Sequence, residues 1–168
     1  MAEQLASYLV DLFQNKIPEE LIIFVISLFP ILELRGGMIA ASILGLDLIP
    51  SFIICYIANM LPIPFILLFI RKIFQFLRDK PVFGKLIQKL EIRSMRKSDT
   101  VKKYGKWGLL AFVAIPLPGT GGWTGALIAA LMDMRIRTST LVIAVGVFIA
   151  GVIMSVISYG IPALISML

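Results

Sequence analysis

The sequence predicts an all-helical integral membrane protein made of two inverted-repeat units, each a re-entrant helical hairpin followed by a transmembrane helix, with amphipathic interfacial helices beside them. Three observations lead to this prediction. Of the 168 residues, 59% are hydrophobic and only 15% are charged, which is unusual for a soluble domain. The basic residues gather in one stretch of the chain. Two of the apolar stretches are interrupted near their middle by proline and glycine.

The charged side chains are distributed unevenly along the chain. Residues 1–50 carry two basic and six acidic side chains, whereas residues 71–106 carry twelve basic and three acidic ones. Because basic loops stay on the cytoplasmic side of a membrane, segment 71–106 is expected to be cytoplasmic, in a multi-pass protein of the inner membrane. Its apolar residues recur at helical spacing, which predicts an amphipathic helix on the inner leaflet. A solvated basic loop that only sets the topology is the alternative.

The elements are expected to follow one another within a single membrane domain, residues 1–168. An interfacial helix on the outer side comes first, over residues 1–18, because its apolar side chains share one face. The first repeat is expected over residues 19–70, the basic segment over 71–106 and the second repeat over 107–168. The four apolar stretches, residues 21–46, 48–70, 107–132 and 139–159, are each long enough to cross a bilayer.

The first and third apolar stretches contain helix breakers. Pro30 stands in the first, shortly before the sequence ELRGG, and Pro116, Pro118 and Gly119 stand in the third. About nine residues precede each break, which is about 13 Å of helix, roughly half of the ~30 Å hydrocarbon core. A chain that reaches the middle of the membrane, turns and goes back fits these lengths. Four ordinary spans with proline kinks are the alternative.

The two broken stretches match each other weakly at an offset of 86 residues. Pro30 then meets Pro116, and Gly36 meets Gly122. With the basic segment inside, the first hairpin enters from the outer side and the second from the cytoplasm. The two units therefore have opposite orientations, which is the plan of many secondary transporters.

Three stretches resemble a known family. The sequences ELRGGMIAASILGLD, NMLPIPFILLFI and KYGKWGLLAFVAIPLPGTGGWTGALIAALM are similar to the small multidrug export proteins, a branch of the DedA superfamily. The resemblance covers nearly the whole chain and implies two opposed re-entrant hairpins. For the wider superfamily it implies movement of lipid-linked phosphates, such as undecaprenyl phosphate, or of phospholipids across the bilayer.

The chain departs from the superfamily pattern at the second break. That pattern has an arginine just before the turn and another shortly after it, where this chain has Val113 or Ala114 and Thr120 or Gly121. Glu33 is similar to the acidic residue of the first hairpin in those relatives. Arg35 is expected to take over the phosphate role of the missing arginines.

The two breaks are the candidate binding site. New half-helices are expected to begin near residues 36–38 and 121–123, and their free N–H groups suit an anion such as phosphate. The candidate residues are Glu33, Arg35, Gly36, Gly37, Asn59, Thr120, Gly121, Gly122, Trp123 and Thr124. Glycine allows close approach of a headgroup, and the threonines supply hydroxyls. The alternative is that the glycines only pack the hairpins together.

Glu33 and Arg35 are charged residues inside an apolar stretch, where charges usually mark a pathway or pair with one another. Two residues apart, their side chains do not face each other on a regular helix, although they can meet in a non-helical turn. We expect Arg35 to bind a phosphate and Glu33 to exchange a proton or bind a cation. An internal pair with a structural role is the alternative. Asn59 could bond across to a hairpin or lie at a simple proline kink.

Three functions are compatible with these residues. The first is translocation of a polyprenyl phosphate or phospholipid, either driven by a proton or cation gradient or passive. The second is export of small cationic or amphipathic drugs, and the third is a membrane scaffold that transports nothing. We expect no enzyme activity, cofactor or metal site, because the chain has no histidine and no Walker-type phosphate loop. The expected partners are membrane lipids, chiefly anionic ones. Pairs of small residues four positions apart in the last helix suggest close packing, within the chain or in a homodimer. Nucleic-acid binding is not expected.

Overall fold

The computed structural model describes residues 17–78, 99–117 and 119–161, together with residues 4, 7, 8, 10 and 92. Over these residues the regular structure is helical and contains no strand, so the predicted all-helical class is confirmed. The predicted interfacial helix, residues 1–18, and the middle of the basic segment, residues 71–106, lie mostly outside the described residues. Those two expectations stay predictions.

The first pair of short helices is α2 (Glu19–Leu28) and α3 (Glu33–Ile43). Helix α2 ends at Leu28, two residues before Pro30. The residue before a proline avoids the helical conformation, and Phe29 is extended, with ψ at 135°. Helix α3 begins at Glu33, three residues earlier than the expected restart near residue 36. The two helices pack against each other as a hairpin.

A long apolar segment follows, made of α4 (Leu48–Met60) and α5 (Ile63–Arg78). The prolines at positions 62 and 64 separate the two helices by one short turn. Residues Leu48–Ile70 are together long and apolar enough to cross a membrane. This segment therefore gives one candidate span, with a break near its middle.

The second pair of short helices is α8 (Lys106–Ala114) and α9 (Gly122–Leu131), preceded by α7 (Asp99–Tyr104). Helix α8 ends before Pro116 for the same reason that α2 ends before Pro30, and Ile115 is extended, with ψ at 118°. Helix α10 (Ile136–Ser155) continues into a π-helical turn, η1 (Val156–Gly160). Residues Ile136–Gly160 form the second candidate span in the described part of the chain.

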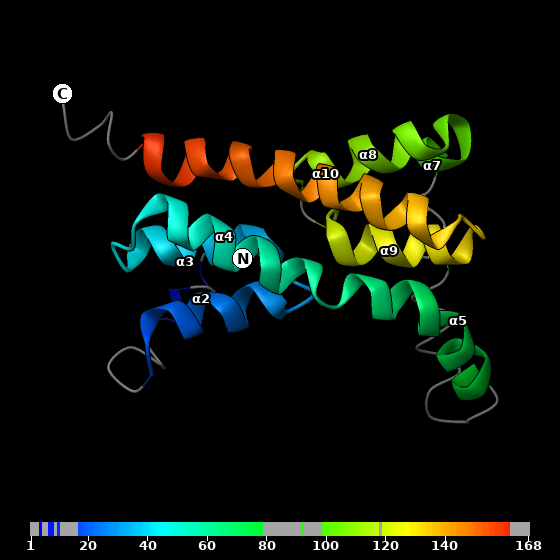
Figure 1. Ribbon diagram of the computed structural model, residues 1–168, viewed down its shortest axis with the longest axis horizontal. Helices are drawn as coiled ribbons and strands as arrows, with labels where there is room; N and C mark the ends of the chain where they lie inside the picture. Colours follow the sequence, from blue (N-terminus) through cyan, green and yellow to red (C-terminus); the bar gives the residue numbers. More distant parts are fainter. Residues whose placement is uncertain are drawn as a thin grey trace.

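The two hairpins lie end to end along the long axis of the molecule, with their turns facing each other near its centre (Figure 1). Helices α4 and α5 together run along this whole axis, and so does α10. Helix α10 packs against α3 of the first hairpin and α8 and α9 of the second. The long helices thus hold the two turns opposite each other.

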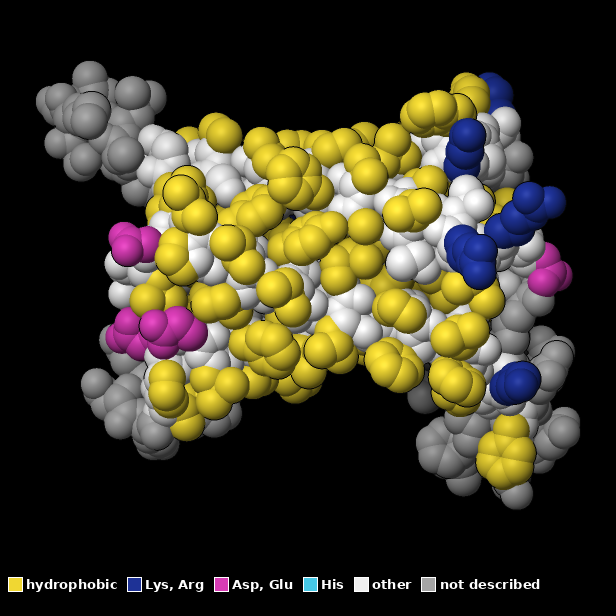
Figure 2. Space-filling model, in the orientation of Figure 1, with side chains coloured by type: hydrophobic (Ala, Val, Ile, Leu, Met, Phe, Trp, Pro, Cys, Tyr) yellow, Lys and Arg dark blue, Asp and Glu magenta, His cyan; other side chains and the backbone are white. Residues whose placement is uncertain are grey.

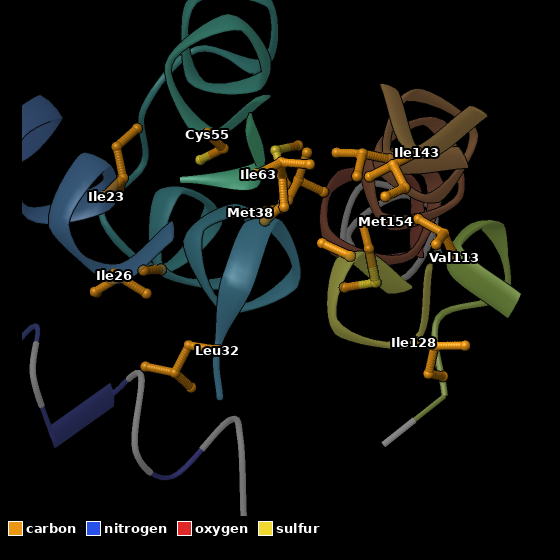
Figure 3. Packing of buried hydrophobic residues seen from close by; sticks show 14 of the residues in the cluster. Ile23, Ile26, Leu32, Met38, Cys55, Ile63, Val113, Ile128, Ile143 and Met154 are labelled. Atoms are coloured by element: carbon orange, nitrogen blue, oxygen red, sulfur yellow. The ribbon is translucent and has the colours of Figure 1, made fainter. Parts of the chain in front are cut away.

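The buried side chains of both halves form one apolar cluster (Figure 3). Helices α8 and α10 approach closely within it, because a Cβ at Gly146 would lie 2.8 Å from the Cβ of Val113. Helices α2, α3 and α4 approach closely at Gly37, where a Cβ would overlap the hydroxyl of Ser27 and lie 2.7 Å from the sulfur of Cys55. The cluster therefore depends on small residues where helices touch.

The outer surface is divided along the same axis (Figure 2). Most acidic side chains on this face gather at one end, basic ones gather at the other end with an acidic one beside them, and apolar side chains cover the region between. The exposed apolar residues include Ile49, Phe65, Leu141 and Phe148. An apolar band with charged ends is the surface of a membrane protein.

Candidate functional site

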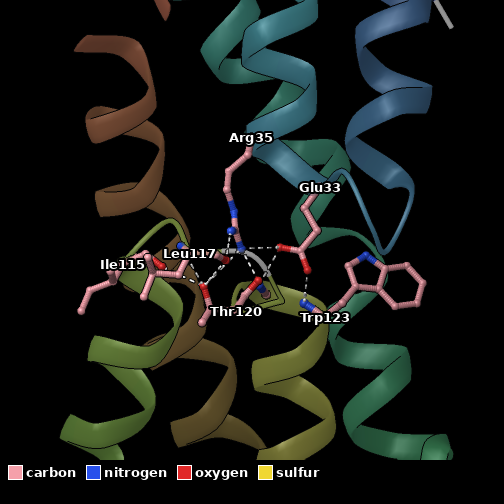
Figure 4. Close-up of polar contacts among 7 residues, drawn as sticks. Glu33, Arg35, Ile115, Leu117, Thr120 and Trp123 are labelled. Atoms are coloured by element: carbon pink, nitrogen blue, oxygen red, sulfur yellow. Dashed lines mark hydrogen bonds and ion pairs between the residues drawn. The ribbon is translucent and has the colours of Figure 1, made fainter. Parts of the chain in front are cut away.

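The carboxylate of Glu33 lies at the centre of the molecule and is bound to the opposite hairpin (Figure 4). It accepts hydrogen bonds from the backbone N–H of Gly122, at 3.0 Å, and of Trp123, at 3.2 Å. Because α9 begins at Gly122, these are two of the N–H groups that have no partner within the helix. A residue of the first hairpin therefore caps a helix of the second, where the dipole of the helix favours negative charge.

The guanidinium of Arg35 also binds the second turn, but it donates hydrogen bonds where Glu33 accepts them. It donates to the backbone carbonyl oxygens of Leu117 and Thr120, and its Nη2 lies 3.4 Å from the hydroxyl of Thr120. Nη2 also lies 3.9 Å from Oε2 of Glu33. We call the set of contacts made by Glu33 and Arg35 with the second turn the tip latch.

The two charged residues meet because the backbone at Glu33 is not helical. Its φ is +52°, in the left-handed region that non-glycine residues seldom adopt. This conformation at the first residue of α3 lets the carboxylate of Glu33 and the side chain of Arg35 reach the same turn. The meeting of the two side chains in a non-helical turn is one of the arrangements expected from the sequence. Glu33 is only 3% exposed, and the side chain of Arg35 is partly buried beside it.

The second turn is shaped by Thr120. Its hydroxyl lies 2.8 Å from the carbonyl oxygens of both Ile115 and Leu117, and it can donate to one of them at a time. It also accepts from the N–H of Leu117 at 3.2 Å. The threonine thus satisfies backbone groups of the turn where no helix can do so.

Gly121 is the point of closest approach between the hairpins. Its φ is +123°, and a Cβ there would overlap Oε2 of Glu33 and lie 2.5 Å from Nη2 of Arg35. The tip latch therefore needs a residue without a side chain at this position.

A small cavity lies beside the tip latch. Its volume is about 10 Å³, which is room for about one water molecule. The lining residues are Glu33, Leu34, Arg35, Asn59, Val113, Gly121, Gly122, Val147 and Ala150. A phosphate headgroup is larger than a water molecule, so this cavity does not hold one while the tip latch is closed.

The structure brings together most of the predicted site residues. Glu33, Arg35, Thr120, Gly121, Gly122 and Trp123 form the tip latch, and Asn59 lines the cavity. Trp123 takes part through its backbone N–H. Pro30, Pro116 and Gly119 stand in the turns, while Pro118 lies outside the described residues.

Three predicted residues lie away from the latch. Gly36 and Gly37 are buried against α2 and its turn, and a Cβ at Gly36 would lie 2.6 Å from the Cβ of Leu32. Thr124 is half-buried on the first turn of α9 and does not line the described cavity. The carbonyl of Leu117 is a contact that sequence reasoning missed, since any residue type supplies a backbone carbonyl.

No group of His, Cys, Asp and Glu side chains that could hold a metal ion occurs among the described residues.

Residues 33–153 match the model of a protein family described as "Putative small multi-drug export protein". The matched region covers well over half of the chain, begins at Glu33 and contains the whole tip latch. No curated protein and no solved structure matches the chain. The expected relation to the DedA superfamily stays a prediction.

Proposed function

We propose that this chain, which belongs to the family described as putative small multi-drug export protein, is a multi-pass transporter of the inner membrane with two re-entrant hairpins of opposite orientation. The observation that carries this proposal is the tip latch. In the hydrocarbon core, a non-helical turn is tolerated only where protein or water satisfies its backbone groups. Arg35 and Glu33 do this for the carbonyls and the N–H groups of the second turn.

Helix lengths support the re-entrant arrangement. Helices α2, α3, α8 and α9 have 10, 11, 9 and 10 residues. Each is therefore about 15 Å long, or half of the ~30 Å core, whereas α10 with 20 residues is about 30 Å long. The acidic and basic ends of the surface then lie at the two faces of the membrane.

The substrate we propose is a lipid-linked phosphate, either a polyprenyl phosphate or a phospholipid. The N–H groups of Gly122 and Trp123 already hold an anion, the carboxylate of Glu33, and Arg35 lies beside it. A phosphate oxygen needs the same donors, since helix N-termini and guanidinium groups are the usual ligands of phosphate. When the tip latch opens, the headgroup takes the place of the carboxylate, and Glu33 acts as the residue that couples transport to an ion gradient.

A second function, export of small cationic or amphipathic compounds, is favoured by the description of the family. In that case Glu33, a buried carboxylate at mid-membrane depth, pairs with the cation. The two functions make different demands on Arg35, which binds a phosphate and repels a cation.

Binding measurements on Arg35 variants distinguish these functions. We expect native mass spectrometry of the detergent-purified parent to show retention of polyprenyl phosphate in preference to neutral phospholipid and to a lipophilic cation. Arg35→Ala should lower this retention at least about tenfold, because it removes a charge-assisted contact with phosphate. Arg35→Lys should retain an intermediate amount, since lysine keeps the charge and loses the bidentate geometry.

Cation retention that disappears in Glu33→Gln would instead support drug export. Equal retention of all ligands by the parent and both Arg35 variants would contradict both transport functions and favour a scaffold.

A further inference from the structure

Asn59 is buried near the C-terminal end of α4 and only 2% exposed. Its side-chain oxygen Oδ1 has no hydrogen-bond partner in the protein. Its side chain runs beside the start of α9, because a Cβ at Gly122 would lie 3.6 Å from Nδ2. Burying an amide oxygen without a hydrogen-bond partner costs folding free energy, so we expect a donor to lie beside this oxygen in the native protein.

The small cavity is the place where that donor can lie. Asn59 and Glu33 both line it, and its volume of about 10 Å³ matches one water molecule. Its remaining walls are apolar side chains, namely Leu34, Val113, Val147 and Ala150, apart from the Arg35 side chain and the two glycines. Asn59 and Glu33 are thus the lining residues whose side chains carry an oxygen that can accept a hydrogen bond from a ligand.

The charges around the cavity favour a neutral ligand. A metal cation is disfavoured because Arg35 lies 3.9 Å from the Glu33 carboxylate and the start of α9 carries partial positive charge. An anion is disfavoured because Glu33 lines the same cavity and because Asn59 Oδ1 needs a donor. A water molecule has two hydrogens to donate, one for Asn59 Oδ1 and one for the carboxylate.

We infer that this cavity is the binding site of one water molecule that bridges Asn59 and Glu33 and passes protons to and from Glu33. A proton that arrives on this water as hydronium moves to Oε2 of Glu33, and a neutral water remains. The protonated carboxyl group is a poorer acceptor for the N–H groups of Gly122 and Trp123, so the tip latch weakens. This inference rests on the proposed role of Glu33 as the coupling residue.

The charged and titratable groups near Glu33 are few. Arg35 is the charged group that acts on it from its own helix. The helices packed against α3 carry three further titratable side chains away from the charged residues at their starts. These are Cys55 and Tyr56 on α4 and Tyr159 on η1. Tyr56 donates to the carbonyl of Ala144 at 3.2 Å. The other charged residues of α2, α8 and α10 stand at the starts of these helices, and each of these helices begins near an end of the molecule (Figure 1). In our inference the proton therefore reaches Glu33 through the bridging water and not from these side chains.

The rate of proton exchange at Glu33 tests this inference. In infrared spectra of the full chain in lipid bilayers, the Glu33 carboxyl band is identified by its loss in Glu33→Gln, and its hydrogen–deuterium exchange is followed. Asn59→Leu removes the acceptor, and Ala150→Val fills the cavity from α10 while leaving Asn59 in place. We expect both variants to slow the exchange at least about tenfold, since both remove the water.

Ser139→Ala is the matched control, because Ser139 is also buried with an unpartnered hydroxyl but does not line the cavity. It should exchange at the parent's rate. The inference would be overturned if folded Asn59→Leu and Ala150→Val exchanged at the parent's rate. It would also be overturned if the Glu33 carboxyl band responded to Na⁺ and not to pH. If the proposed substrate is wrong, the binding measurement shows it separately, because the parent protein then retains no polyprenyl phosphate in native mass spectrometry.

Discussion

Replacement of Glu33 with alanine is expected to destabilise the folded protein by about 3 kcal/mol, the lower end of the range for breaking a buried ion pair. The change leaves the guanidinium of Arg35 without its counter-charge and the N–H groups of Gly122 and Trp123 without an acceptor. Arg35 keeps its two carbonyl acceptors, which is why the loss is not larger. Reversible unfolding in mixed micelles of a denaturing and a mild detergent measures this free energy.

Glu20→Ala is the control for the loss of an acidic residue, because Glu20 is exposed at the start of α2. Its free energy of unfolding should change by less than about 0.5 kcal/mol. The double variant Glu33→Ala/Arg35→Ala should lose less than the sum of the two single variants, since the two residues interact directly. Losses of the same size in Glu33→Ala and Glu20→Ala would show that the tip latch does not stabilise the fold.

Gly121→Ala is expected to separate the two hairpin turns and to cost at least about 3 kcal/mol in unfolding free energy, as backbone strain and steric overlap add. Gly121 has φ at 123° and ψ at −171°, a conformation that is essentially restricted to glycine. A Cβ would also occupy the position of the Glu33 carboxylate. The same unfolding measurement detects the loss.

Gly45→Ala isolates the contribution of strain. Gly45 has φ at +71°, but no atom lies within 4 Å of the position of its Cβ. This variant should lose only about 1 kcal/mol, the cost of a left-handed residue with a side chain. If Gly121→Ala lost no more than Gly45→Ala, the close contact between the hairpins would be contradicted.

The breaks in the helices could be predicted from the sequence because their cause is local. A proline restricts the residue before it, and α2 and α8 both end where Pro30 and Pro116 require. The sequence predicts the restart of α3 near residue 36, three residues too late, because the glycines of ELRGG suggest the beginning of the helix. Glu33 begins that helix in a left-handed conformation, which glutamate does not prefer. We attribute this conformation to the contacts of Glu33 with Gly122 and Trp123, which are distant in the sequence.

The partners of the charged residues could not be predicted, because they are backbone groups far away in the chain. Glu33 and Gly122 are separated by 89 positions, and Arg35 and Leu117 by 82. A charge in an apolar stretch indicates that some partner exists, but any residue supplies an N–H or a carbonyl. For the same reason the sequence did not separate Gly121, which the latch requires, from Gly37, which packs against Ser27 and Cys55.

The central claim, two re-entrant hairpins whose turns meet inside the membrane, is tested most directly by the sidedness of their ends. In a Cys55→Ala background, single cysteines replace Glu20, Asp47, Lys106 and Arg135, and a membrane-impermeant thiol reagent is applied to intact cells and to inverted vesicles. We expect positions 20 and 47 to react only in intact cells, and positions 106 and 135 only in inverted vesicles. Reaction of positions 20 and 47 from opposite sides would contradict the account and establish ordinary kinked spans.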